Sequence, residues 1–118
     1  MRAIRGATQL DLDEREHLLA ATRELVTAVL DANGLGSEDL VSIIFTLTTD
    51  LRSEFPALAA RELGMGDVPL LCTVEIDVPG AMPRVVRLMA HAEMDVPRSA
   101  VQHVYLRGAA ALRRDLAQ

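Results

Sequence analysis

The clearest pattern in the chain is a stripe of apolar residues at helical spacing, between the acidic run 11–16 and Asn33-Gly34. The acidic run suits the positive end of a helix dipole, and Asn-Gly is typical of a helix end. The stripe therefore predicts one long helix, whose buried face is formed by Leu18, Leu19, Thr22, Leu25, Val26, Val29 and Leu30.

Short runs rich in apolar and β-branched residues predict strands elsewhere. They are RAIRGAT at 2–8, taken to end at Gly6, VSIIFTLT at 41–48, VPLLCTVEIDV at 68–78, RVVRLMAHAEM at 84–94 and HVYL at 103–106. Further helical segments are a turn capped at 37–39, PALAAREL at 56–63, and a tail AAALRRDLAQ that forms a last helical turn or a mobile end. The order predicts an α+β fold with one long helix against four or five strands, in a single domain over residues 1–118.

Composition adds an expectation about assembly. Half of the residues are hydrophobic, but only 3% are aromatic and Trp is absent, so the core depends on Leu, Val, Ile, Ala and Met. Small domains with a modest core often gain stability by burying one face against a symmetric copy. An oligomer is therefore expected.

Charge and segment patterns exclude several classes of partner. The net charge of −5 argues against nucleic acid or an anionic membrane surface, although all 12 basic residues are Arg. No stretch approaches the roughly 18 consecutive apolar residues of a membrane span, and the N-terminus lacks the apolar region of a signal peptide. One Cys excludes an intramolecular disulfide. We expect a cytoplasmic protein without a membrane partner.

Two charged residues within apolar strands are the main candidates for chemistry. Arg87 shares a strand face with Val85 and Met89, and both faces of that strand look buried, so its guanidinium needs an anion. Glu75 lies in another apolar strand, where a solvent-facing position is the simple interpretation. For Arg87, a carboxylate partner in a structural pair is favoured over a ligand. The two residues, on adjacent strands, could form a salt bridge with each other or could flank a polar ligand, and the sequence alone does not choose.

Other reactive residue types carry weaker signals. Cys72 lies three positions before Glu75, so an ideal strand places the two on opposite faces, and a lone Cys is more often a small buried hydrophobe. The three histidines lack metal-ligand spacing, and Gly34-Leu35-Gly36 follows a helix rather than a strand, unlike a nucleotide-binding loop. No metal or cofactor is expected.

Five segments together resemble the AroH class of monofunctional chorismate mutases, typified by the Bacillus enzyme. They follow the family's order and spacing along nearly the whole chain: IRGAT at 4–8, FPALAARELG at 55–64, VPLLCTVEIDVPG at 68–80, VVRLM at 85–89 and DVPRSAVQHVYLRGAAALRRDL at 95–116. The resemblance implies the intramolecular Claisen rearrangement of chorismate to prephenate in Phe and Tyr biosynthesis, without a cofactor or covalent catalysis. It also implies a homotrimer of ferredoxin-like subunits that forms a pseudo-α/β-barrel, with active sites between subunits.

Residue roles follow from the same resemblance. The catalytic and substrate-binding groups would be Arg5, Cys72, Glu75, Arg87 and Tyr105. The pocket wall, mouth and closing tail would include Phe55, Ala57, Leu58, Arg61, Leu71, Leu112 and Arg113. Two departures are visible, because Leu58 stands where the typical member has Lys and Arg114 stands where it has Pro.

Two other functions remain open from the sequence. A binding-only relative could keep the trimer and Arg5 but leave chorismate unchanged. Trimeric enamine/imine deaminases share a similar barrel and inter-subunit clefts, and use an Arg for a carboxylate. They lack the combination of Cys72, Glu75 and Arg87 seen here, which places them below the mutase interpretation.

Overall fold

A computed structural model describes residues 1–115 of the chain, with side chains described through Leu112. Its strands are β1 (Arg2–Gln9), β2 (Leu40–Leu47), β3 (Leu70–Val74), β4 (Val85–Ala92) and β5 (Val104–Leu106). Its α-helices are α1 (Arg15–Asn33), α2 (Pro56–Glu62) and α3 (Ala110–Asp115), with short 3-10 turns at Ser37–Asp39, Arg98–Ala100 and Arg107–Ala109. The predicted order of helices and strands is confirmed.

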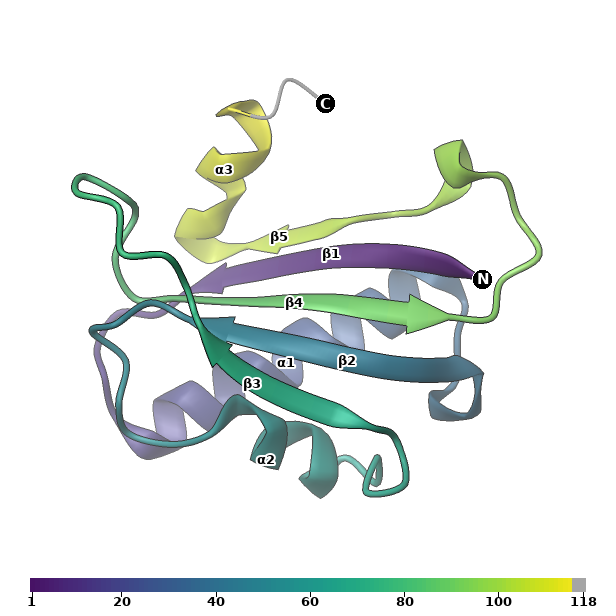
Figure 1. Ribbon diagram of the computed structural model, residues 1–118, viewed down its shortest axis with the longest axis horizontal. Coiled ribbons are helices and arrows are strands. Elements are labelled where there is room, and N and C mark those ends of the chain that lie inside the picture. Colours follow the sequence, from purple (N-terminus) through teal and green to yellow (C-terminus); the bar gives the residue numbers. More distant parts are fainter. Residues whose placement is uncertain (116–118) are drawn as a thin grey trace.

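The five strands form one mixed sheet in the order β3-β2-β4-β1-β5. β4 is antiparallel to both of its neighbours, whereas β1 pairs with β5 and β2 pairs with β3 in parallel. Helix α2 makes the crossover between the parallel strands β2 and β3 (Figure 1). The expected α+β sheet is confirmed. Its element order differs from the βαββαβ order of a ferredoxin-like unit, because a helix separates β2 from β3 and β4 follows β3 without a helix between them.

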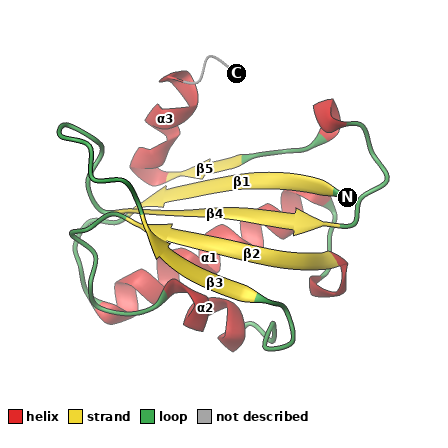
Figure 2. Cartoon of the chain, viewed as in Figure 1, coloured by secondary structure: helices red, strands yellow, loops and turns green. Residues whose placement is uncertain are grey.

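Helices α1 and α2 cover one face of the sheet, behind it in the view of Figure 2. The predicted stripe of α1 supplies Leu18, Leu25 and Val29 to the core, which also contains Ile4 and Phe45 from the strands. We call the opposite face the open face. It is covered at one end, where Leu112 of α3 and Met82 of the loop between β3 and β4 pack against the cluster of Ala7, Val85 and Ala109.

Strand β1 is longer than expected, because Gly6 does not end it. The ladder with β4 continues from Gly6 to Gln9. A Cβ atom at Gly6 would lie 3.2 Å from side-chain atoms of Leu88 and Val29. The glycine therefore permits close packing of α1 against the sheet and is not a turn signal.

Strand β3 is shorter than expected and ends at Val74, not at residue 78. Its partner β2 ends at Leu47, whose carbonyl accepts the last bond of this ladder from the Glu75 amide at 2.8 Å. The residues just after Glu75 have no partner strand in the described part of the sheet, so their apolar side chains are exposed. Ile76 is 86% exposed. The apolar pattern of 68–78 thus reflects an exposed surface as well as a strand.

The described part of the chain contains no helix that is long and apolar enough to cross a membrane.

Candidate active site

A cavity of about 180 Å³ lies on the open face, and we call it the central pocket. All five strands contribute to it, directly or through the residue that follows them. Its lining consists of Arg5, Gly6, Ala7, Ile44, Thr46, Glu75, Arg87, Leu88, Met89 and Tyr105. Four of the five predicted catalytic residues, Arg5, Glu75, Arg87 and Tyr105, are therefore brought together.

Short side chains on the strands create the hollow. Arg87 of β4 lies between Ala7 of β1 and Thr46 of β2 in the sheet register, and Tyr105 of β5 pairs with Ala7 on its far side. Because Ala7 and Thr46 are small, the long side chains around them enclose a space above the sheet. Sequence reasoning missed these two positions, although Ala7 has the same strand parity as Arg5. No predicted site residue lies on β2 to indicate Thr46.

Arg87 and Glu75 meet across β2. The distance from Arg87 Nε to Glu75 Oε1 is 3.5 Å, and the side chains are 45% and 25% exposed, respectively. The expectation that both faces around Arg87 are buried is wrong, since helices cover only the opposite face. The pair also belongs to non-adjacent strands, because β2 separates β3 from β4. The ion pair and a ligand-facing position are thus compatible.

Thr46 carries an unusual polar group at the base of this pocket. Its Oγ1 is buried and has no hydrogen-bond partner within residues 1–115. An unsatisfied buried hydroxyl is unfavourable, so its place beneath Arg87 and Glu75 favours a site at which a ligand or water supplies the partner.

The pocket lining contains two guanidinium groups and one carboxylate, which favours a ligand with more than one negative charge. The lining residues include no Cys, His or Ser that could act as a nucleophile or neutral-range base. Among residues 1–115, no group of three or more His, Cys, Asp and Glu side chains is arranged to hold a metal ion.

The remaining predicted site residues lie elsewhere in the single chain. Cys72 packs against the helix-covered core, on the face opposite Glu75, as ideal strand alternation predicts. Leu71 is exposed on the edge strand, and Leu112 packs beside Ala7 and Tyr105 near the pocket. The side chains of Arg113 and Arg114 lie outside the described residues.

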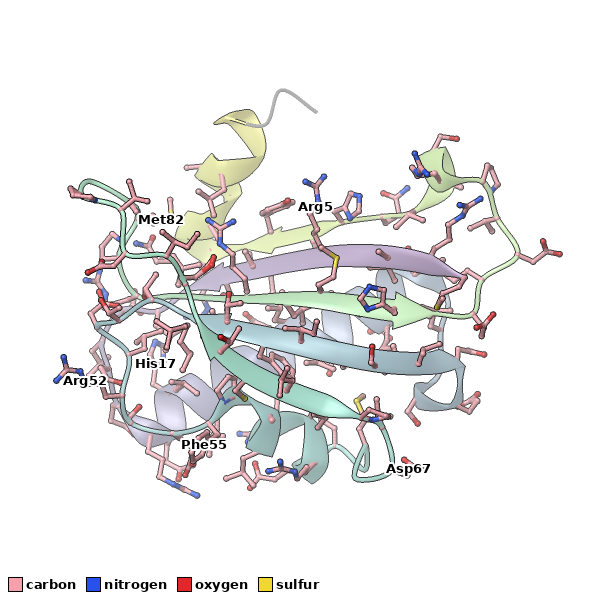
Figure 3. All side chains as sticks on the ribbon, in the orientation of Figure 1. Arg5, His17, Arg52, Phe55, Asp67 and Met82 are labelled. Atoms are coloured by element: carbon pink, nitrogen blue, oxygen red, sulfur yellow. The ribbon has the colours of Figure 1, made fainter. Side chains whose placement is uncertain are left out.

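The residues expected at the pocket wall lie at α2, on the other side of the sheet. Phe55 precedes α2 and is 67% exposed, Ala57 is buried, Leu58 is half-buried and Arg61 is exposed. Figure 3 shows Phe55 beside α2, well separated from Arg5. One chain therefore does not bring these residues to its own central pocket.

Hydrogen bonds position the segment that presents Phe55. The Asp13 carboxylate accepts bonds from the backbone amides of Arg52 at 3.0 Å and Ser53 at 3.1 Å. Hydrogen bonding by Ser53, with a smaller contribution from Arg52, holds the pKa of Asp13 below its usual value. The Phe55 amide and the Arg15 side chain similarly lower the pKa of Glu54, to which they donate.

Known proteins resemble the chain over nearly its full length. The family model for chorismate mutase type I matches residues 1–116. Curated relatives named chorismate mutase AroH are 51% identical in Thermus thermophilus, over 98% of this chain and 96% of the relative, and 39% identical in Bacillus subtilis (strain 168), over 98% and 92%. A solved chorismate mutase from Clostridium thermocellum matches with a TM-score of 0.93 at 41% identity, covering 94% of this chain and 99% of that one.

These matches confirm the resemblance inferred from the five segments, and the pocket on the open face brings together the charged residues of three of them. The chain belongs to the chorismate mutase type I family.

Proposed function

We propose that the chain converts chorismate to prephenate in the central pocket, as a step of Phe and Tyr biosynthesis. Membership of the chorismate mutase family makes it an isomerase. The observation that carries the proposal is the convergence of Arg5, Arg87, Glu75 and Tyr105 around one hollow on the open face. Two guanidinium groups in this hollow match a substrate with two carboxylates.

The rearrangement is concerted and stays within one molecule. One C–O bond breaks and one C–C bond forms, with no proton, electron or group transferred to the protein. Arg87 stabilises the partial negative charge that develops on the ether oxygen, and so favours the transition state over the ground state. Glu75 accepts a hydrogen bond from the ring hydroxyl as positive charge builds on the ring.

Arg5 and Tyr105 hold a substrate carboxylate and keep the ether arm folded over the ring, so that the reactive conformer is selected. Cys72 supports the strand that presents Glu75, because its side chain faces the core. Leu112, which packs beside Ala7 and Tyr105, closes the pocket from the tail.

A second chain completes the site. The cavity of about 180 Å³ is smaller than the roughly 300 Å³ at the lower end of ligand pockets, and it is open to solvent. We propose a homotrimer with a pseudo-α/β-barrel core, in which each pocket receives its missing wall from a neighbour. That wall would contain Phe55, Ala57, Leu58, Arg61 and Leu71.

Exposed apolar residues at the sheet edge support this assembly. Leu71, Val74, Ile76 and Val78 are each more than half exposed in the single chain. Several large exposed apolar side chains on one short segment favour a protein–protein interface there. It extends from the strand that presents Glu75, so an interface there would lie beside the pocket.

The test is the loss of chorismate absorbance on addition of purified protein, with acid conversion of the product to phenylpyruvate as the identity check. We expect catalysed loss with prephenate as the product. Bound but unchanged chorismate would instead establish the binding-only function, and hydrolysis of imines without prephenate formation would establish the deaminase alternative.

A further inference from the structure

A second cavity, of about 310 Å³, lies beside the start of β1, and we call it the Arg98 pocket. Its basic lining residues are Arg2, Arg5, Arg98 and His103, and its apolar ones include Met89 and Val101. Arg5 and Met89 also line the central pocket, so the two cavities adjoin. Figure 3 labels Arg5, one of the two residues that the cavities share.

Hydrogen bonds hold the walls of the Arg98 pocket in place. Arg2 Nε donates to the Val96 carbonyl at 2.8 Å, which joins β1 to the segment before Arg98. Asn33 at the end of α1 donates to the Gln102 carbonyl and accepts from the Gln102 amide, both at 2.9 Å. The residues on either side of the 3-10 turn Arg98–Ala100 are thus tied to β1 and to α1.

A fourth hydrogen bond orients His103. The Arg5 amide donates to His103 Nδ1 at 2.9 Å. This bond ties His103, in the wall of the pocket, to the backbone of β1.

The charge of the Arg98 pocket contrasts with that of the whole chain. The protein has a net charge of −5, yet three Arg residues and no Asp or Glu line this cavity among the described residues. No ion pair to Arg2 or Arg98 is found within residues 1–115. The guanidinium groups of Arg2 and Arg98 are therefore suited to a planar anion from solution.

We propose that the Arg98 pocket is a second binding subsite, which holds a small organic dicarboxylate next to the central pocket. Arg98 and Arg2 bind the carboxylates, and Met89 and Val101 contact the carbon skeleton. Its volume is within the range of small-ligand sites. The subsite lies outside the group formed by Glu75, Arg87 and Tyr105, so its existence does not depend on the reaction catalysed there.

The test is a titration with malonate, followed by the amide chemical shifts of residues 98–103. It uses the Arg87→Ala protein, in which the central pocket has lost a guanidinium, so that binding there does not obscure the signal. We expect saturable shifts with malonate and none with neutral malonamide. Introducing Arg98→Gln into the Arg87→Ala protein should weaken malonate binding about tenfold, because one charge-assisted contact is lost.

Arg23→Gln on α1 is the matched control, since it also removes one Arg charge from the surface but leaves both cavities intact. Malonate affinity should then change less than twofold. The proposal is overturned if Arg87→Ala gives no malonate shifts at 98–103, if Arg98→Gln leaves the affinity unchanged, or if malonamide binds equally well. Chorismate turnover by the unmodified protein tests the proposed function separately.

Discussion

At the scale of single residues, the neighbours of Arg87 determine what its charge can do. Ala7 and Thr46 flank it in the sheet and are too short to cover it, so the guanidinium faces a hollow that also contains Glu75. A larger side chain at either flank would fill the space that a ligand needs. Arg87 is therefore exposed to the pocket, not enclosed in a structural ion pair.

Replacement of Arg87 tests its role in the transition state. We expect Arg87→Ala to lower kcat about 10²–10³-fold, equivalent to about 2.7–4 kcal/mol, because a preorganised donor to the developing charge is lost. Steady-state kinetics and sedimentation measure turnover and assembly on the same sample. Two results together would show that the ion pair with Glu75 is structural. The Arg87→Ala protein would lose its assembly, and the fraction that still assembles would keep its turnover.

Thr46→Val tests the unsatisfied hydroxyl beneath the pocket. The change is nearly isosteric and removes a buried group without a protein partner, so the melting temperature should stay constant or rise. We expect kcat/KM to fall about tenfold, because a contact to the ligand or its water is lost. Thr8→Val is the matched control: Thr8 Oγ1 is also buried without a partner but lies away from the pocket. Equal losses of activity in both variants would contradict the prediction.

The proposed mechanism also predicts the pH profile. No group gains or loses a proton in the proposed rearrangement, so kcat/KM should vary less than about twofold between pH 6 and 8.5. The measurement is the rate of chorismate loss in buffers of constant ionic strength. A bell-shaped profile centred near neutral pH would indicate acid–base catalysis instead.

At the scale of elements, the loop before α2 depends on carboxylates. Asp13 accepts bonds from the amides of Arg52 and Ser53, while Glu54 accepts from Arg15 and from the Phe55 amide. These contacts connect the start of α1 to the start of α2. They also set the direction in which Phe55 leaves the surface.

Acid should weaken this loop first. The pKa of Asp13 is lower in the folded chain than its ordinary value, so its contribution to stability is present at neutral pH and is lost as the pH falls through that lowered pKa, below about 4. We expect Asp13→Asn to melt at a lower temperature than the unmodified protein at pH 7, with the difference shrinking toward pH 3. Thermal melts at several pH values measure this, and a difference independent of pH would contradict it.

At the scale of the whole molecule, the sheet has one covered and one open face. Helices α1 and α2 bury the first, and the second contains both cavities. The exposed apolar side chains after β3 continue from its edge. In a single chain, therefore, the wall of the pocket is incomplete and the apolar side chains at the sheet edge are exposed. One interface with a second chain would complete the wall and bury these side chains.

Ile76→Asp tests that interface. Ile76 is 86% exposed in the single chain, so the change should leave the subunit folded but place a charge in the proposed contact. We expect dissociation of the proposed trimer in sedimentation and at least a tenfold loss of activity. Leu12→Asp, at another exposed apolar position that is 52% exposed, is the control and should stay assembled. An active, assembled Ile76→Asp protein would place the interface elsewhere.

Much of the fold could be predicted because its helices and strands depend on the order of residues within short segments. The period of α1, the Gly34 end with its left-handed backbone, and Pro56 at the start of α2 are properties of short segments. The sequence also determined the family, since five segments in the family's order span the chain. Arg87 and Glu75 were identifiable because charge within an apolar strand is unusual.

Only the tertiary structure decided which residues meet. Strand order brings Glu75 across β2 to Arg87, and a local pattern contains no information on strand order. The length of β3 depended on where its partner ended, and the function of Gly6 depended on the approach of α1. The exposure of Arg87 likewise followed from which face the helices cover. Each depends on contacts between residues distant in sequence, which hydrophobic periodicity along one segment does not encode.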